Sequence, residues 1–366
     1  MDQGLGNDVS KILYNAARRT WATRAGKIGD VTEPFEDFSG IKLVDIGGLA
    51  KGSYLGLGFD GVGTKVELAE RTAKHDTVAH DLFAMACDDA VAKGLEPAII
   101  GSVLDLSRLR KDDPSHVEML KALARGYMDA AMAANVAIIN GEAAQLGYRV
   151  AGYGEFNYNW SAGLVSFARS DRIITGQNVG AGDSIVALRE EGLRSNGMTD
   201  MRETMEAEYG QEWHMEESSG RLIAQEALRP SVIYTRAVVD MHGGFDGDPR
   251  ARINGIAHIT GGGIPEKLGR VLKVTGLGAE LYDLFDPNWI MIYCQSLSGM
   301  SDHVAYRTWN MGQGMLVMTP EPQKVVDIAG EHGIESKVAG EITHKPGIRI
   351  RSKGYDSNPI ELSFKA

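Results

Sequence analysis

Apolar residues in the first half of the chain recur with two spacings, one typical of helices and one typical of strands. Ile12, Leu13, Ala16 and Ala17 share one stripe of a helix, whereas apolar runs that end at Gly or Asn are short enough to be strands. The pattern predicts helices over residues 1–20, 75–93 and 114–134, and strands over residues 55–59, 98–104, 136–139 and 162–168. This alternation predicts an α/β domain over residues 1–168.

A second domain, of the α+β class, is predicted over residues 169–366. The pattern predicts strands over residues 184–188, 256–260, 289–294 and 315–319, helical segments between residues 197 and 242, and a helix over residues 321–332. Ser231 is a suitable residue to begin a helix and Gly243 to end one. Ser115 and Glu118 have the spacing of a capping box at the start of the 114–134 helix.

Composition and charge narrow the classes of function. The 38 Lys and Arg against 49 Asp and Glu give a formal net charge of −11, which disfavours nucleic acid and anionic membranes as partners. No apolar run reaches the ~18 residues of a membrane span, and the first residues do not resemble a signal peptide. Only two cysteines are present, Cys87 and Cys294. We therefore expect a cytoplasmic protein that acts on a small molecule.

Glycine is over-represented, and several of the 45 glycines lie where predicted strands end. The loop Asp60-Gly61-Val62-Gly63-Thr64-Lys65 combines a carboxylate, glycines, a hydroxyl and a lysine. Such a loop can hold a metal, expose backbone N–H groups and bring a cation to phosphate. It does not have the spacing of a Walker A motif, and a plain turn explains the same residues.

Acidic residues on the next predicted helix form a second candidate. Asp81 and Asp88 are seven residues apart and share a helix face, with Asp89 beside them and apolar residues between. The negative charge of a buried carboxylate must be compensated, either by a divalent cation or by ordinary hydrogen bonds.

Two further loops carry polar residues at strand ends. Gly141 and Glu142 follow the 136–139 strand. At a strand end, Glu142 can either contact a ligand or be a solvated carboxylate without a role in binding. His258 and Thr260 lead into Gly261, Gly262 and Gly263, which can form an anion-binding nest or a flexible turn. The sequence has no H-E-x-x-H, no zinc spacing and no G-x-S-x-G. These features favour an enzyme that handles a magnesium-bound nucleotide.

In their order along the chain, these motifs resemble the phosphoribosylformylglycinamidine cyclo-ligase (aminoimidazole ribonucleotide synthetase) family. The matching segments are Asp60–Lys65 (D-G-V-G-T-K), His75–Thr77 (H-D-T), Asp81–Met85 (D-L-x-A-M), Asp89 with Gly94–Pro97 (D-x-x-x-x-G-x-E-P), Ser195–Gly197 (S-N-G), Ala257–Gly263 (A-H-I-T-G-G-G) and Tyr306–Gly312 (Y-R-T-x-N-x-G). The resemblance covers most of the chain.

The resemblance implies a fold, a reaction and a set of site residues. The fold is a two-domain α/β (α+β) structure whose N-terminal strands join a dimer barrel, with ATP in a cleft. The reaction closes the imidazole ring of formylglycinamidine ribonucleotide with ATP and Mg²⁺, and the protein would be a homodimer. The resemblance assigns to ATP binding Asp60, Gly61, Gly63, Thr64, Lys65, Asp81, Asp88, Gly141 and Glu142. It assigns to substrate binding Arg194, Ser195, Asn196, Thr260, Gly261, Gly262 and Gly263. The residues assigned to Mg²⁺ are Asp60, Asp89 and Glu142, and those assigned to catalysis are Lys65, Asp89 and His258. Lys65 would neutralise charge on the transferred phosphoryl group, and His258 would carry a proton.

The chain departs from the family pattern at several of these places. The family's G-G-E-T-A-E contains Asn140, Ala143 and Gln145 here, its H-S-N-G begins with Arg194, and its N-terminal glycine-rich segment is poorly matched. Arg194 could bind phosphate. Two alternatives to the cyclo-ligase therefore stay open: another ATP-dependent relative, such as a thiamine-monophosphate kinase, and a non-catalytic nucleotide-binding paralogue. Selenophosphate synthetase and the hydrogenase-maturation dehydratase fit less well, because neither cysteine lies where those families need one.

Overall fold

The computed structural model describes residues 3–32, 42–110, 113–356 and 360–365. The chain divides into two compact units, the first made of Met1–Ala90 and Leu95–Ser170 and the second of Val91–Gly94 and Asp171–Ala366. None of the helices in the described part of the chain has the length and apolar character that crossing a membrane requires.

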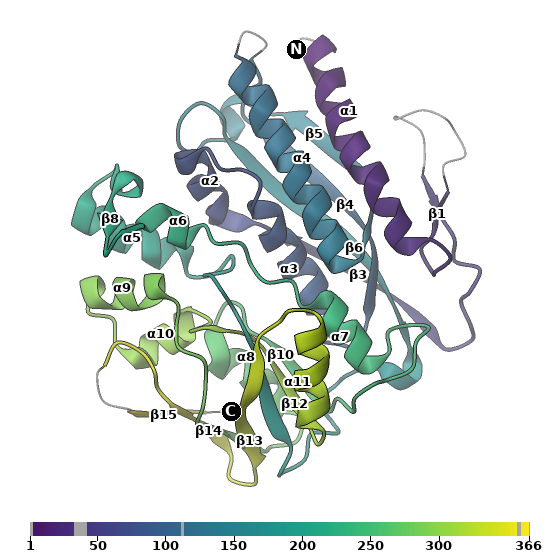
Figure 1. Cartoon of the computed structure of the whole chain (residues 1–366), viewed down its shortest axis with the longest axis vertical. Coiled ribbons are helices and arrows are strands. Elements are labelled where there is room, and N and C mark those ends of the chain that lie inside the picture. The colour runs from purple at the N-terminus through teal and green to yellow at the C-terminus, as the bar shows by residue number, and fades with distance from the viewer. Residues whose placement is uncertain (1–2, 33–41, 111–112, 357–359, 366) are drawn as a thin grey trace. The chain divides into compact units, whose positions relative to one another are not determined.

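In the part of the first unit that the structure describes, helices pack with a four-stranded sheet (Figure 1). Its elements are α1 (Gln3–Thr20), β1 (Val31–Thr32), β2 (Leu43–Val44), β3 (Ser53–Gly61), α2 (Val66–Thr72), α3 (Val78–Val91), β4 (Glu96–Leu106), α4 (Pro114–Ala134), β5 (Ala137–Gln145) and β6 (Tyr158–Arg169). The sheet order is β3-β6-β4-β5, in which only β4 and β5 run parallel. Strands β3 and β5 are therefore the two edges.

The two faces of this sheet differ in character. Along β6, Trp160, Ala162 and Leu164 are buried, whereas the residues between them are more exposed. On β3, the alternate residues Leu55, Leu57 and Phe59 have 61%, 62% and 76% of their surface exposed. A strand that exposes large apolar side chains on one face is a surface that other protein normally covers.

Helices α1 and α4 lie side by side in this unit (Figure 1). Helix α4 begins with Pro114, and the Asp113 carboxylate caps it by accepting a hydrogen bond from the backbone N–H of Ser115 at 2.9 Å. The helix therefore has its cap on Asp113, two positions before the Ser115 of the predicted capping box.

The second unit is built on a seven-stranded sheet of order β10-β12-β7-β13-β11-β14-β15, in which only β11 and β14 run parallel. Its elements are β7 (Ser184–Arg189), α5 (Met198–Tyr209), β8 (Glu217–Ser218), β9 (Arg221–Leu222), α6 (Ile223–Ala227), α7 (Thr235–His242), β10 (Gly255–His258), α8 (Gly263–Leu272), β11 (Gly278–Leu281), α9 (Trp289–Ser298), α10 (Asp302–Thr308), β12 (Gln313–Thr319), α11 (Pro322–Glu331), β13 (Ser336–Thr343), β14 (Gly347–Arg351) and β15 (Glu361–Phe364).

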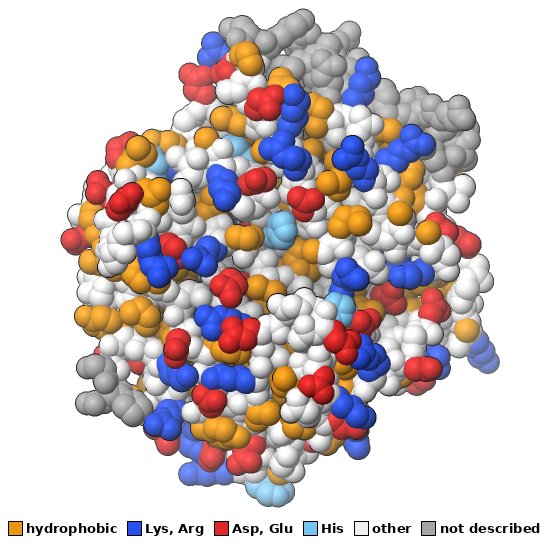
Figure 2. All heavy atoms as spheres, in the orientation of Figure 1, with side chains coloured by type: hydrophobic (Ala, Val, Ile, Leu, Met, Phe, Trp, Pro, Cys, Tyr) orange, Lys and Arg blue, Asp and Glu red, His pale blue; other side chains and the backbone are white. Residues whose placement is uncertain are grey.

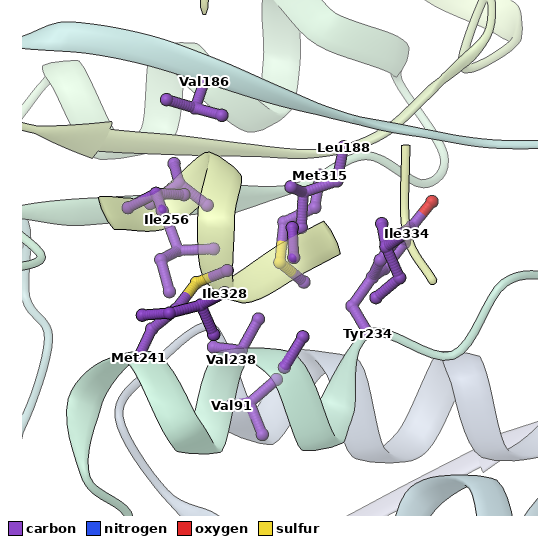
Figure 3. Packing of buried hydrophobic residues seen from close by; sticks show 14 of the residues in the cluster. Val91, Val186, Leu188, Tyr234, Val238, Met241, Ile256, Met315, Ile328 and Ile334 are labelled. Atoms are coloured by element: carbon purple, nitrogen blue, oxygen red, sulfur yellow. The ribbon is translucent and has the colours of Figure 1, made fainter. Parts of the chain in front are cut away.

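The core of this unit lies between the sheet and helices α7 and α11 (Figure 3). Val186, Ile256 and Met315 come from three neighbouring strands, and Val238 and Ile328 reach them from the two helices; each is at most 3% exposed. This core holds the strand ends of β7 and β10 in fixed positions, and two loops with chemistry-bearing residues start from those ends.

Two predictions for the second unit are wrong. The segment 289–294, expected as a strand, is helix α9, because Ile290, Met291, Cys294 and Gln295 are buried with helical spacing; a short apolar run does not distinguish the two structures. Ser231 does not begin a helix, since α7 starts at Thr235, but Gly243 ends that helix as expected, with φ 83°.

The surface carries both signs of charge. On the face seen in Figure 2, acidic and basic side chains are interspersed with apolar ones. Many charges pair locally, as Arg250 does with Glu331 at 2.7 Å.

Candidate active site

The D-G-V-G-T-K loop lies where β3 runs into α2. Asp60 is the penultimate residue of β3, and its Oδ1 accepts a hydrogen bond from the backbone N–H of Gly61 at 2.8 Å. Gly63 has φ 71° and, with Thr64, is exposed. This loop therefore presents backbone and hydroxyl groups to solvent, as expected of a phosphate-binding loop.

Lys65 lies inside the first unit and pairs with an acidic residue of helix α3. Its side chain is 0% exposed, and its Nζ lies 2.8 Å from Oδ1 of Asp81, which is also 0% exposed. A buried lysine in contact with a buried carboxylate neutralises that carboxylate. The negative charge of Asp81 is therefore compensated by Lys65, a residue of the same unit. The contacts of Lys65 and Asp81 with ATP stay predictions, to which the structure adds that the two side chains pair with each other.

The other acids of α3 point in different directions. Asp88 is fully buried, whereas Asp89 is exposed. Burial, together with the neighbouring charge of Asp88, raises the pKa of the Cys87 thiol. Asp89 is therefore the α3 carboxylate that a ligand from solvent can reach.

Glu142 is not brought together with Asp60 within one chain. The two residues lie on β5 and β3, the opposite edges of the sheet. Asp60 pairs with Ala162, which in turn pairs with Ser102, whereas Glu142 pairs with Val103, the next residue along β4. The two carboxylates therefore also leave opposite faces. Among the described residues, no three His, Cys, Asp or Glu side chains gather as a metal site.

A cavity of about 320 Å³ in the first unit has Gly141 and Glu142 in its wall. Tyr14 and Trp21 line it from the N-terminal helical segment, and Lys42 and Trp160 line it from other segments. Trp21 donates its indole N–H to the carbonyl oxygen of Ile138 at 2.7 Å, which fixes one wall. The indole N–H of Trp160 is buried and has no hydrogen-bond partner among the described residues. Aromatic walls with a few polar groups are typical of small-molecule sites.

No motif in the sequence indicated the aromatic wall of this cavity. Tyr14, Trp21 and Lys42 belong to segments without a motif, and Trp160 lies inside a strand. None of the other residues assigned to ATP, which are Asp60, Gly61, Gly63, Thr64, Lys65, Asp81 and Asp88, lines this cavity.

The second unit brings two predicted loops together. One runs from β7 to α5 and carries Ser195 and Asn196; the other runs from β10 to α8 and carries the three glycines. A Cβ on Gly261 would lie 3.3 Å from Nδ2 of Asn196, so the loops touch. Ser195 Oγ and Asn196 Oδ1 are buried without hydrogen-bond partners among the described residues. Buried polar atoms of this kind suit a bound ligand.

The glycines of the second loop have a structural reason. Gly263 has φ 61°, and a Cβ there would lie 2.0 Å from the carbonyl oxygen of Tyr306. Gly262, at φ 89°, precedes the first turn of α8. The loop therefore needs glycine, and it leads directly into a helix N-terminus, where backbone N–H groups favour an anion.

Arg194 is buried inside the same region. Its Nη1 lies 2.6 Å from Oε2 of Glu190, and both side chains are 0% exposed. Its Nη2 lies 2.7 Å from Nε2 of His258. Burial raises the pKa of Glu190, whereas Arg194 and backbone N–H groups of Val232 and Glu191 oppose that shift. The phosphate contact of Arg194 stays a prediction, and the structure adds that its charge is paired with Glu190, a residue that the sequence did not single out.

Comparison with known proteins agrees with this architecture. Residues 43–159 match the family described as AIR synthase related protein, N-terminal domain, and residues 180–353 match its C-terminal domain. The chain is 33% identical over 292 residues to the phosphoribosylformylglycinamidine cyclo-ligase of Methanocaldococcus jannaschii, covering 79% of this chain and 78% of the relative. It is 28% identical over 347 residues to the enzyme of that name from Thermococcus kodakarensis, with 94% of each chain covered.

Solved structures share the fold at lower sequence identity. The hydrogenase maturation protein HypE of E. coli aligns with a TM-score of 0.61 at 15% identity, over 100% of this chain and 98% of HypE. A HypE structure in complex with ATP aligns with a TM-score of 0.55 at 11% identity, over 85% of this chain and 84% of that one. At this identity the likeness concerns the fold alone, a mixed α/β structure of two domains. On its sequence similarity, the chain belongs to the AIR synthase-related family.

Proposed function

We propose that this protein catalyses the ATP-dependent ring closure of formylglycinamidine ribonucleotide to 5-aminoimidazole ribonucleotide, releasing ADP and phosphate. The observation that carries the proposal is the pair of touching loops in the second unit, with Asn196 against Gly261 and unpartnered polar atoms on Ser195 and Asn196. The choice of substrate is supported by the sequence similarity, over 94% of the chain, to a protein named phosphoribosylformylglycinamidine cyclo-ligase.

The reaction has two steps in this proposal. The γ-phosphoryl group of ATP is transferred to the formyl amide oxygen, which makes that oxygen a good leaving group. The amidine nitrogen then attacks the activated carbon, so that a C–N bond forms and the C–O bond to phosphate breaks. The protein contributes mainly position and electrostatics, because phosphoryl transfer requires little covalent chemistry from side chains.

In the first unit, the cavity lined by Trp21 and Trp160 would take the adenine base, and Lys42 would meet its polar edge or the ribose. The exposed backbone N–H groups around Gly63 would face the phosphates. In the second unit, the glycine nest at α8 and the Ser195–Asn196 loop would hold the ribonucleotide phosphate.

Magnesium fits the residues present. Mg²⁺ usually takes one or two carboxylates and completes its shell with phosphate oxygens and water, and Asp60 and Asp89 would supply the carboxylates. Bound there, the ion would neutralise charge on the transferring phosphoryl group.

Glu142 enters this proposal through a second copy of the chain. The exposed apolar face of β3 and the two free edges of the first sheet support a closed two-copy barrel, which leaves no unpaired strand edge. A metal held by both Asp60 and Glu142 would take them from different copies, because one sheet holds them on opposite edges and faces.

The test is ADP release from purified protein with Mg-ATP, measured with and without formylglycinamidine ribonucleotide. We expect substrate-dependent ADP with an equal amount of aminoimidazole product. ADP formation with thiamine monophosphate instead would replace the proposal by a kinase. ATP binding without any substrate-dependent turnover would replace it by a non-catalytic role.

A further inference from the structure

The contact between Arg194 and His258 defines the protonation state of the histidine. Nη2 of Arg194 lies 2.7 Å from Nε2 of His258, and both side chains are buried, at 0% and 5% exposed. A guanidinium group has five N–H donors, no acceptor, and stays protonated in proteins. At this distance Nε2 of His258 must therefore be the acceptor and carry no proton. A neutral imidazole with an unprotonated Nε2 has its proton on Nδ1.

Arg194 is itself held firmly in place. Its Nη1 donates to Oε2 of Glu190 at 2.6 Å, and the centre of its guanidinium lies 5.5 Å from the centroid of the Tyr234 ring. The Oε1 atom of Glu190 accepts backbone N–H groups from Glu191 and Val232 at 2.9 and 3.2 Å. Arg194 also has φ 59°, a conformation that costs a non-glycine residue energy and occurs often at functional sites.

We propose that Arg194 is a positioning residue, which with Glu190 holds His258 as the neutral Nδ1–H tautomer, so that His258 acts in ring closure as a hydrogen-bond donor. The catalytic part rests on the proposed function; the tautomer does not. His258 cannot take up a proton at Nε2 while the guanidinium occupies that atom. Its Nδ1–H can donate to an oxygen that gains negative charge. This replaces the proton-carrying role that the family resemblance implied for His258.

The tautomer is measured directly by NMR on full-length protein with ¹⁵N-labelled histidine. The spectrum reports the ring nitrogen shifts of the nine histidines, and the signals that disappear in His258→Asn identify His258. We expect a protonated-type shift at Nδ1 and an unprotonated-type shift at Nε2 near neutral pH. A proton found on Nε2 in the wild-type protein would overturn the proposal, whatever the enzyme catalyses.

Three variants separate positioning from a merely structural role. Glu190→Gln with Arg194→Met removes both charges together, so that no buried charge is left unpaired, and should release His258 into the Nε2–H tautomer. Arg194→Lys keeps a donor-only cation and should keep Nδ1–H. Arg250→Gln removes an exposed arginine of the same unit and should leave the His258 signals unchanged.

Kinetics complete the test. The uncharged double variant should lose on the order of 100-fold in kcat with the KM for ATP unchanged, and Arg194→Lys should recover part of that loss. An unaltered tautomer or an unaltered kcat in the double variant would contradict the proposal. If the double variant does not fold, the wild-type spectrum and the spectrum of Arg194→Lys still show which tautomer His258 adopts. A wild-type protein with the expected tautomer but no ring-closing activity would refute the proposed function and leave the tautomer assignment standing.

Discussion

Replacing Lys65 by Met should destabilise the first unit strongly, because it leaves Asp81 buried without its cation. The two groups are 2.8 Å apart and 0% exposed. Their attraction is about 6 kcal/mol at an effective dielectric constant of ~20, and desolvation of the two ions offsets much of it. The intact pair therefore contributes little net stability. Its loss is different, since an unpaired buried charge costs about 3–5 kcal/mol, a large part of a typical unfolding free energy.

The assay is chemical unfolding of the wild type, Lys65→Met, Asp81→Leu and the double variant, followed by circular dichroism. We expect each single variant to lose about 3–5 kcal/mol and the double variant to lie within about 1.5 kcal/mol of the wild type. Thr64→Ala, an exposed neighbour, is the matched control and should change stability by at most ~0.5 kcal/mol.

The same four proteins test whether Lys65 touches phosphate. Because the structure gives the lysine a partner inside the unit, the double variant should retain ATP affinity and turnover. A double variant that folds like the wild type but has lost turnover would refute this reasoning and restore the role expected from the motif. Single variants as stable as the wild type would refute the energetic argument.

Four further outcomes are expected. Phe59→Asp, on the exposed face of β3, should shift a dimer to monomer in light scattering; an unchanged mass would exclude this face as the interface. Burial lowers the pKa of His75 to about 4 from 6.5, so the unfolded chain binds the proton first and stability falls as pH drops from about 6.5 to 4, by up to about 3 kcal/mol. His75→Gln should flatten that dependence in unfolding titrations, and an unchanged slope would contradict the assignment. Ala143→Leu, which narrows the 320 Å³ cavity, should weaken ATP binding at least about tenfold in calorimetry, without affecting unfolding. Chelation of Mg²⁺ should abolish ADP release, and Asp60→Asn should raise the Mg²⁺ concentration needed for half activity.

The sequence was informative wherever a local pattern carries the chemistry. The glycines at the start of α8 predicted either an anion nest or a flexible turn, and the structure has a loop there that needs glycine, since a Cβ on Gly263 would meet the Tyr306 carbonyl oxygen. Asn196 and Gly261 come from separate motifs and lie in contact, and a shared role in substrate binding stays a prediction. These features depend on residue types within a few positions of one another.

The other features of the site depend on contacts between residues that are distant in sequence or that belong to no motif. No pattern along the chain indicates that Lys65 pairs with Asp81, because only the fold brings the two side chains together. Glu190 carries no motif, yet it decides what Arg194 can do. The pairing of strands places Glu142 and Asp60 on opposite edges of the sheet, which no periodicity along the chain could reveal.

The buried pair of Glu190 and Arg194 also constrains how such a site can evolve. An arginine at position 194 without glutamate at position 190 would bury an unmatched guanidinium, and a glutamate at position 190 without arginine at position 194 would bury an unmatched carboxylate. Either state would cost about 3–5 kcal/mol of a folding free energy of about 5–15 kcal/mol. The two positions are therefore coupled in this chain: a mutation that removes one charge alone carries that cost, whereas a joint change of both residues avoids it.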